Sequence, residues 1–495
     1  MKLEDRFNFK ISDKKISFIY YLLAVIIGLL NIIRIFNISY CGDEAFSIKL
    51  AQMTIPNMIQ QTAADVHPPL YYIFIRAGYL LLGNNGYAYH LVSIIPVLSM
   101  IVFSLTIIRK KYGKIVSILF IVLETFMGSC FTYNLQVRMY SWANFLVFLC
   151  FWFGIEILEG RGIQKNWIFF TLSGILAAYT HYYALISVAF IYITVYLVIV
   201  LENKKNFWKC ILSGFVCIIS YLPWLGILMA SFRRTSSSWW STEIPTFQEC
   251  IGFMIGTDIL SKLIVVLFVI SIVVFIKKMN AIYKPMLISD AIRIDTKALK
   301  KIIQTDEIIN MFLVIISIMG TVCVGIGLSK IFRPLFLSRY TFVLVGALGL
   351  CICIFIGKAF QNCKVAIIII LLIFLSGSYV WFQSYRMERG VNDATIDSVQ
   401  DIQALYENGD RVVCNINPLD WTVLDYYFDF KHDTYNGFSK EYVGNTTWLI
   451  YNGALEKDFV SQIESNEGRI DLINSGKIAN YGYDLYKVSF EKNTD

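Results

Sequence analysis

Two adjacent carboxylates, Asp43 and Glu44, follow the first long apolar segment of the chain, residues 18–38. A carboxylate at a membrane surface can serve as a general base toward a hydroxyl group. Ionisable groups at such places cost free energy, so each needs a partner or a function. Taken alone, the pair is better explained as the acidic first turn of a helix. Catalysis becomes the favoured interpretation only if other reactive side chains reach the same face.

Four further side chains fall at or next to predicted outer positions. Asp65 and His67 lie in the same loop as the carboxylate pair, just before two prolines that hold the backbone extended. His181 and Tyr182 lie at the junction of two later apolar segments, where a capped helix end is the alternative explanation. We expect these side chains to line a substrate site or to support its loops.

The same residues could bind a divalent metal ion, with Glu44, Asp65, His67 and His181 as ligands. Their spacing does not match a zinc motif, and the sequence contains no two cysteines separated by two residues. No other cofactor is indicated.

Arg138 lies at the start of the fourth apolar segment, and Arg339 and Tyr340 lie at the start of the tenth. Both arginines depart from the usual excess of basic residues in cytoplasmic loops. Guanidinium groups present paired donors that suit phosphate oxygens. Snorkelling toward lipid headgroups is the alternative, but phosphate binding is favoured for these two residues.

A general base together with a set of cations suits a reaction that deprotonates a nucleophile and releases a phosphate. Transfer of a sugar from a lipid phosphate meets both requirements. The carboxylate would take the proton of an acceptor hydroxyl, and the cations would stabilise charge on the departing phosphate. A single displacement of this kind inverts the configuration of the sugar.

The elements that position these residues are mostly membrane helices. The 495-residue chain is 57% hydrophobic and only 16% charged, whereas soluble domains carry about 25% charged residues. It is predicted to be a polytopic α-helical membrane protein. Apolar windows flanked by Lys and Arg predict about eleven spans, at 18–38, 87–108, 115–131, 139–158, 166–180, 182–201, 208–228, 259–276, 309–328, 338–357 and 365–383.

Basic loops alternate along these spans, which predicts a cytoplasmic N-terminus and an outer first loop at residues 39–86. Residues 70–82 in this loop are apolar but too short to cross, because thirteen helical residues reach only ~20 Å against a hydrocarbon core of ~30 Å. We expect them to form a helix along the membrane interface.

Residues 384–495 contain 10 basic and 19 acidic residues, whereas the preceding 383 contain 33 and 17. The acidic segment is predicted to be a small extracytoplasmic α/β domain. We expect helices at 396–406, 419–429 and 458–464, and strands at 410–416, 446–451 and within 469–490. Basic residues are scattered through short loops, so a nucleic-acid partner is not indicated.

In this order the motifs resemble the GT-C superfamily of membrane glycosyltransferases, nearest to its branch of protein O-mannosyltransferases and aminoarabinose transferases. The resemblance covers residues 18–383 and rests on Asp43-Glu44, His67-Pro68-Pro69-Leu70-Tyr71-Tyr72, Arg138-Met139-Tyr140, Thr180-His181-Tyr182-Tyr183 and Arg339-Tyr340. Val66-His67 stands where the aminoarabinose branch has an acid followed by Lys, so that branch's exact substrate is not carried over.

The resemblance implies a glycosyltransferase domain in residues 1–383, whose loop 39–86 carries the catalytic carboxylates, followed by an extracytoplasmic domain in 384–495. It implies a polyprenyl-phosphate sugar as donor. The acceptor would be a glycan, lipid or protein of the cell envelope. The expected location is the plasma membrane, among membrane lipids, of a bacterial cell.

The resemblance also implies residue roles. Asp43 would be the general base, with Glu44 beside it, and Arg138 and Arg339, with Tyr340, would contact the donor phosphate.

Two alternative classes stay open: a lipid or sugar transporter, and a polysaccharide ligase or polymerase. A transporter is expected to hold charges near the bilayer midplane on repeated halves, and a ligase to place its working loop between late spans. In this sequence the charges gather at outer helix ends and in the first loop.

Overall fold

The computed structural model describes residues 13–36, 39–161, 163–202, 206–235, 243–287, 305–360, 363–407, 409–416, 422–443 and 446–490. The chain divides into two compact units. The membrane unit contains Met1–Ile33 and Thr54–Trp381, and the C-terminal unit contains Arg34–Met53 and Phe382–Asp495. These units differ from the predicted division after residue 383, because Arg34–Met53, which includes the start of the first loop, belongs to the C-terminal unit.

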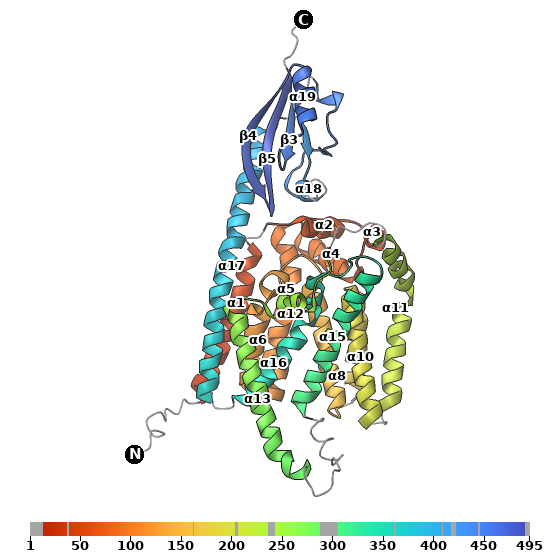
Figure 1. Cartoon of the computed structure of the whole chain (residues 1–495), viewed down its shortest axis with the longest axis vertical. Coiled ribbons are helices and arrows are strands. Elements are labelled where there is room, and N and C mark those ends of the chain that lie inside the picture. Colours follow the sequence, from red (N-terminus) through yellow and green to blue (C-terminus); the bar gives the residue numbers. More distant parts are fainter. Residues whose placement is uncertain are drawn as a thin grey trace, which may run out of the picture. The chain divides into compact units, whose positions relative to one another are not determined.

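In the residues that the structure describes, the membrane unit forms helices and no strand, since a segment in a bilayer must satisfy its own backbone hydrogen bonds. Several helices, among them α5, α6, α8, α10, α15 and α16, run side by side (Figure 1). The helices of this unit are α1 Asp13–Ile33, α3 Ile55–Ala64, α4 Leu70–Leu82, α5 Gly86–Phe103, α6 Arg109–Phe126, α7 Cys130–Tyr133, α8 Tyr140–Leu158, α9 Gln164–Ala178, α10 Tyr182–Glu202, α11 Phe207–Thr235, α12 Phe247–Ile255, α13 Ile259–Leu287, α15 Asp306–Ile331, α16 Val345–Ala359 and the first part of α17 Cys363–Leu405.

Within the described residues, nine helical segments are long and apolar enough to cross a membrane, and each of the eleven predicted segments lies mostly on a helix. Two predicted spans run together as Gly86–Phe126, which bends at Gly113, where φ is +90°. The predicted span 166–180 forms α9, whose 15 residues reach about 22 Å. The prediction of a polytopic helical membrane protein is confirmed.

The interfacial segment predicted at 70–82 forms α4, with the same bounds. Its first turn is tied to the end of α9, because Leu70 N donates to Tyr179 O at 3.1 Å. Tyr71 is fully buried and its hydroxyl lies 2.9 Å from Ser93 Oγ on α5. The helix is thus fixed on α5 and on the end of α9, next to the break that contains His181.

The C-terminal unit contains α2 Gly42–Gln52 and a five-stranded sheet. The strand order is β2-β1-β3-β5-β4, with β1 parallel to β2 and β3, and β5 antiparallel to β3 and β4. The elements after α17 are β1 Arg411–Cys414, α18 Leu424–Tyr427, β2 His432–Thr434, β3 Thr447–Tyr451, α19 Lys457–Ser465, β4 Gly468–Ile478 and β5 Tyr481–Phe490.

The predicted α/β pattern is confirmed, with two differences. The helix expected at 419–429 is represented by the single turn α18, and residues 417–421 lie outside the described part. The edge strand β2 was not predicted, because His432–Thr434 is short and polar and has no alternating apolar pattern.

One face of the sheet is covered by a core that includes Val412, Ile450 and Leu485 from the strands and Ile402 from the end of α17. Ala45 of α2 belongs to the same core and is 2% exposed. Burial of this residue among the C-terminal side chains is the physical reason why the start of the first loop joins this unit.

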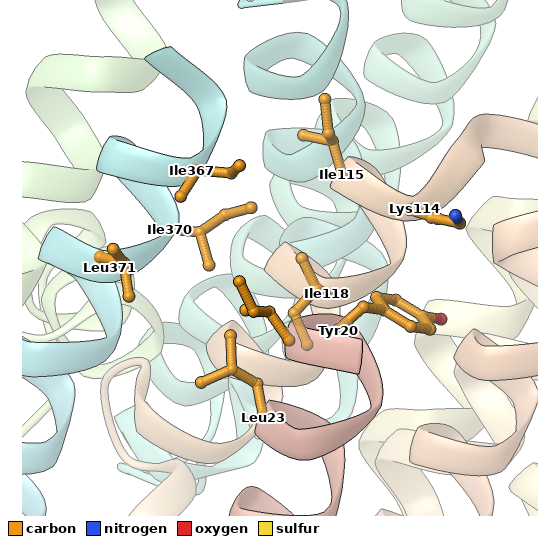
Figure 2. Close-up of a pocket in the computed structure, with 9 residues that line it drawn as sticks. Tyr20, Leu23, Lys114, Ile115, Ile118, Ile367, Ile370 and Leu371 are labelled. Atoms are coloured by element: carbon orange, nitrogen blue, oxygen red, sulfur yellow. The ribbon is translucent and has the colours of Figure 1, made fainter. Parts of the chain in front are cut away.

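An apolar cavity of about 60 Å³ lies among α1, α6 and α17, and Figure 2 shows the side chains that line it. Isoleucine and leucine side chains form most of its wall. Lys114 extends away from them, and its Nζ donates a hydrogen bond to Ser17 Oγ at 2.8 Å. This cavity contains none of the candidate site residues.

Candidate functional site

A cavity of about 460 Å³ lies within the membrane unit among α10, α11 and α15. Most of its wall is apolar, with Leu185, Leu228, Phe232, Leu328 and Phe332 among the lining residues. The polar residues of the wall are His67, His181, Tyr182, Tyr183, Ser231 and Tyr340. Four of the predicted site residues, His67, His181, Tyr182 and Tyr340, therefore line one cavity.

Asp65 and His67 pair with each other at the start of this wall. His67 Nδ1 lies 3.1 Å from Asp65 Oδ2. Burial opposes ionisation of Asp65, but the hydrogen bond and charge of His67, with help from Arg138, lower the pKa of this carboxyl. Asp65 is thus a carboxylate that orients the His67 ring.

The backbone around Asp65 is held by the end of α11. Ser231 Oγ donates to Asp65 O at 3.1 Å, and Arg234 Nη2 donates to Ala63 O at 2.6 Å. These carbonyls lie at the C-terminus of α3, where the last carbonyls lack partners inside the helix and a cation is favourable. Arg234 therefore has a structural partner at the end of α3.

His181 lies in the break between α9 and α10. Its Nδ1 accepts a hydrogen bond from Tyr183 N at 3.1 Å. An imidazole nitrogen that accepts carries no proton, so the neutral ring is protonated on Nε2. The residue is 2% exposed, and Nε2 is a buried donor without a partner among the described residues.

The surroundings of His181 keep it neutral. Burial, followed by the charges of His67, Arg138 and Arg339, lowers the pKa of His181 well below its ordinary value. Its ring centroid lies 5.2 Å from that of Tyr340 and 6.0 Å from that of His67. The structure thus gathers both predicted arginines around a neutral donor.

Tyrosine rings form the wall beside His181. Tyr183 and Tyr340 stack with centroids 4.9 Å apart, and the Arg339 guanidinium carbon lies 5.8 Å from the Tyr340 ring. Tyr182 Oη accepts from Trp224 Nε1 at 3.3 Å. Donors and cations beside an apolar cavity suit an amphipathic ligand with an anionic head and a hydrocarbon tail.

Asp43 and Glu44 lie in the first turn of α2, in the C-terminal unit. Glu44 is 5% exposed, and its Oε2 accepts from Cys41 N at 3.1 Å, so this carboxylate caps the helix. Asp43 is half-buried at the preceding position. Burial, followed by the charges of Glu44 and Asp43, raises the pKa of Cys41, so its thiol is not an activated nucleophile.

The expected metal site does not form among the described residues. No group of three or more His, Cys, Asp or Glu side chains is placed to hold a metal ion there. Glu44 caps its own helix in the C-terminal unit, and Asp65 is paired with His67. His181 presents Nε2 as a donor rather than as a lone pair.

One buried acid was missed by the sequence interpretation. Glu124 on α6 is fully buried, and its Oε2 lies 3.4 Å from Asn144 Nδ2. Asn144 Oδ1 in turn accepts from Gly346 N on α16 at 2.8 Å. The signal was present in the sequence, because Glu124 is the only acid in the apolar run 115–131.

These features define the chain as a polytopic helical membrane protein with a small α/β unit and a polar cluster beside a large apolar cavity. No protein-family model and no characterised protein matches its sequence. Two crystal structures of ArnT from Cupriavidus metallidurans are similar to it. The apo form has a TM-score of 0.56 and covers 95% of this chain, with 98% of ArnT covered in return.

The second structure is ArnT bound to undecaprenyl phosphate, with a TM-score of 0.55 and 96% of this chain covered. Both share 10% sequence identity with the chain. The likeness extends over both units, so the chain has an ArnT-like fold. The fold implied by the resemblance to membrane glycosyltransferases is confirmed.

Proposed function

We propose that this protein is an inverting glycosyltransferase that moves a sugar from a polyprenyl-phosphate donor to an acceptor of the cell envelope. The reaction would take place at the outer face of the plasma membrane, with the N-terminus in the cytoplasm. Asp43 is the general base of this proposal.

The observation that carries the proposal is the polar cluster beside the 460 Å³ cavity, in a fold shared with a protein that binds undecaprenyl phosphate. The apolar wall suits the isoprenoid chain. His181 Nε2 and the guanidinium groups of Arg138 and Arg339 suit the phosphate, because charge-assisted donors bind its oxygens strongly.

The proposed chemistry is a single displacement. Asp43 removes the proton of an acceptor hydroxyl while the oxygen attacks the anomeric carbon. The bond between that carbon and the phosphate oxygen breaks, and the electron pair leaves with the polyprenyl phosphate. Arg138 and Arg339 stabilise the charge that develops on this phosphate.

Asp43→Asn should reduce sugar transfer by a factor of roughly 10² or more, because the amide is not a base at neutral pH. The assay uses full-length protein in proteoliposomes, a panel of polyprenyl-phosphate sugars and envelope extract as acceptor, and it measures released polyprenyl phosphate. Asp429→Asn, an exposed aspartate of the same unit, is the matched control.

Transfer near the wild-type rate by a folded Asp43→Asn variant would remove Asp43 as the base. If no lipid-linked sugar releases polyprenyl phosphate and undecaprenyl phosphate does not bind the wild-type protein, the proposed function itself fails.

A further inference from the structure

The C-terminal unit surrounds the backbone that leads into Asp43. Tyr40 N donates to Tyr427 Oη at 2.9 Å, and Gly42 N donates to Tyr481 Oη at 3.3 Å. Thr422 Oγ1 donates to Gly42 O at 3.2 Å. Three backbone groups within three residues of Asp43 are thus bound by side chains that come 380 or more positions later in the chain.

These contacts are reinforced on both sides. Before the loop, Arg34 is 2% exposed and binds both carboxylate oxygens of Glu388 on α17, at 3.0 and 2.7 Å. A two-point arginine pair fixes direction as well as distance. After the loop, Ala45 is buried in the core of the C-terminal unit.

The arrangement is specific to the residues next to Asp43. Tyr40 also packs its ring edge-on against Tyr426, with centroids 4.8 Å apart. The ion pair farther along α2, between Lys49 and Asp425, is half exposed on both sides and therefore contributes little. Within Arg34–Met53, the part of the first loop that belongs to the C-terminal unit, the turn that carries the carboxylate is therefore held more strongly than the end of α2.

We propose that Tyr427, Tyr481 and Thr422 are positioning residues that hold the backbone of Tyr40 to Gly42 and so aim the Asp43 carboxylate at the acceptor hydroxyl. This inference rests on the proposed function of Asp43. It gives the C-terminal unit a role in catalysis itself, because the general base is built on that unit. The tyrosines act through the backbone and do not touch the substrate.

The chemistry of the two phenols supports this role. Burial is the main cause that raises the pKa of both Tyr427 and Tyr481, so both hydroxyls stay protonated at neutral pH. Each oxygen accepts a backbone N–H, and phenylalanine would leave that N–H without its acceptor while keeping the ring.

The test is a Tyr427→Phe/Tyr481→Phe double variant of the full-length protein. We expect kcat for sugar transfer to fall roughly ten-fold, because a small misplacement of a reacting group is costly. KM for the donor and the affinity for undecaprenyl phosphate should not change, since the cavity lies in the membrane unit. Amide hydrogen exchange at residues 39–46 should become faster.

Two controls accompany this variant. Tyr435→Phe removes a solvent-exposed hydrogen bond from the Tyr435 hydroxyl to Glu456 in the same unit. It should leave kcat and the hydrogen exchange at residues 39–46 unchanged. Thr422→Val removes the bond to Gly42 O, whereas Thr422→Ser keeps a hydroxyl and should transfer sugar faster than Thr422→Val.

Unchanged exchange at residues 39–46 in the double variant would overturn the inference. Faster exchange with unchanged kcat would overturn it too, and Asp43→Asn then separates the two proposals. If Asp43→Asn is inactive, only the positioning role is lost, whereas an active Asp43→Asn would remove the general base itself.

Discussion

His181 illustrates how a single hydrogen bond defines the chemistry of a side chain. The Tyr183 amide donates to Nδ1, which leaves Nε2 as the donor. Arginine charges and burial keep the ring neutral. A sequence containing Thr180-His181-Tyr182-Tyr183 could predict a histidine at a helix junction, but not which nitrogen carries the proton.

Substitution of His181 by asparagine or by glutamine tests which ring nitrogen binds the ligand. The amide of glutamine can take the place of Nε2, whereas that of asparagine lies nearer to Nδ1. We expect His181→Gln to bind undecaprenyl phosphate more tightly than His181→Asn, and both variants to bind it more weakly than the wild type. Complete loss of the charge-assisted hydrogen bond should weaken binding roughly ten-fold. Titration of the lipid phosphate into purified protein measures this order; equal affinity of all three proteins would contradict the donor role.

The lowered pKa of His181 also predicts how stability depends on pH. Between the folded pKa and the unfolded value of about 6.5, the unfolded chain binds more protons, so stability falls as the pH falls below about 6.5. The lowered pKa of Asp65 acts only below about pH 4. Thermal unfolding measured between about pH 7.5 and 5 should show that the wild type loses more stability on acidification than His181→Gln does. If stability depends on pH equally in both proteins, His181 is not the cause of the dependence.

At the level of elements, the loop after α6 approaches the end of α12 without room for a side chain. Gly128 has φ +52°, and a Cβ there would overlap the Met254 carbonyl. Gly256, which ends α12 with φ +95°, lies on the other side of the same contact. Backbone approach of this kind is available only to glycine.

Gly128→Ala should therefore destabilise the protein strongly, by roughly 3 kcal/mol or more, because both conformational strain and overlap with backbone arise. Gly160→Ala is the matched control: Gly160 has φ +82° but nothing within 4 Å of an added Cβ, so only about 1 kcal/mol is expected. Thermal unfolding in detergent compares the two variants, and equal losses would show that the approach to Met254 is not limiting.

At the level of the whole molecule, the loop after α1 is divided between two units. Arg34–Met53 packs with the C-terminal sheet, whereas the segment from Thr54 onward, with Asp65 and His67, packs with the membrane helices. The Asp43-Glu44 pair therefore belongs to the C-terminal unit, whereas Arg138, His181 and Arg339 belong to the membrane unit.

The proposed orientation predicts which loops are accessible from outside the cell. A membrane-impermeant maleimide should label Ser475→Cys on β4 in intact cells, because the C-terminal unit is proposed to lie outside. Arg161→Cys, in the exposed turn after α8, should react only after permeabilisation. Wild-type protein reports labelling of the native cysteines, and the reverse pattern would invert the topology.

The sequence by itself determined the membrane architecture, because long apolar runs and basic loops are local signals that tertiary packing does not change. In the described residues each of the eleven predicted segments lies mostly on a helix, α4 has the predicted bounds, and most strands of the C-terminal sheet were predicted. The sequence also named the residues His67, His181, Tyr182 and Tyr340, which line one cavity.

Only the tertiary structure decided how these residues work together. The pairing of Asp65 with His67, the tautomer of His181 and the cap formed by Glu44 depend on hydrogen-bond geometry. The partners of the turn at Asp43 come from residues 422–481, far along the chain, so no local pattern could have revealed them. Folding brings such distant groups together because burial of apolar surface, rather than sequence proximity, determines which segments pack against each other.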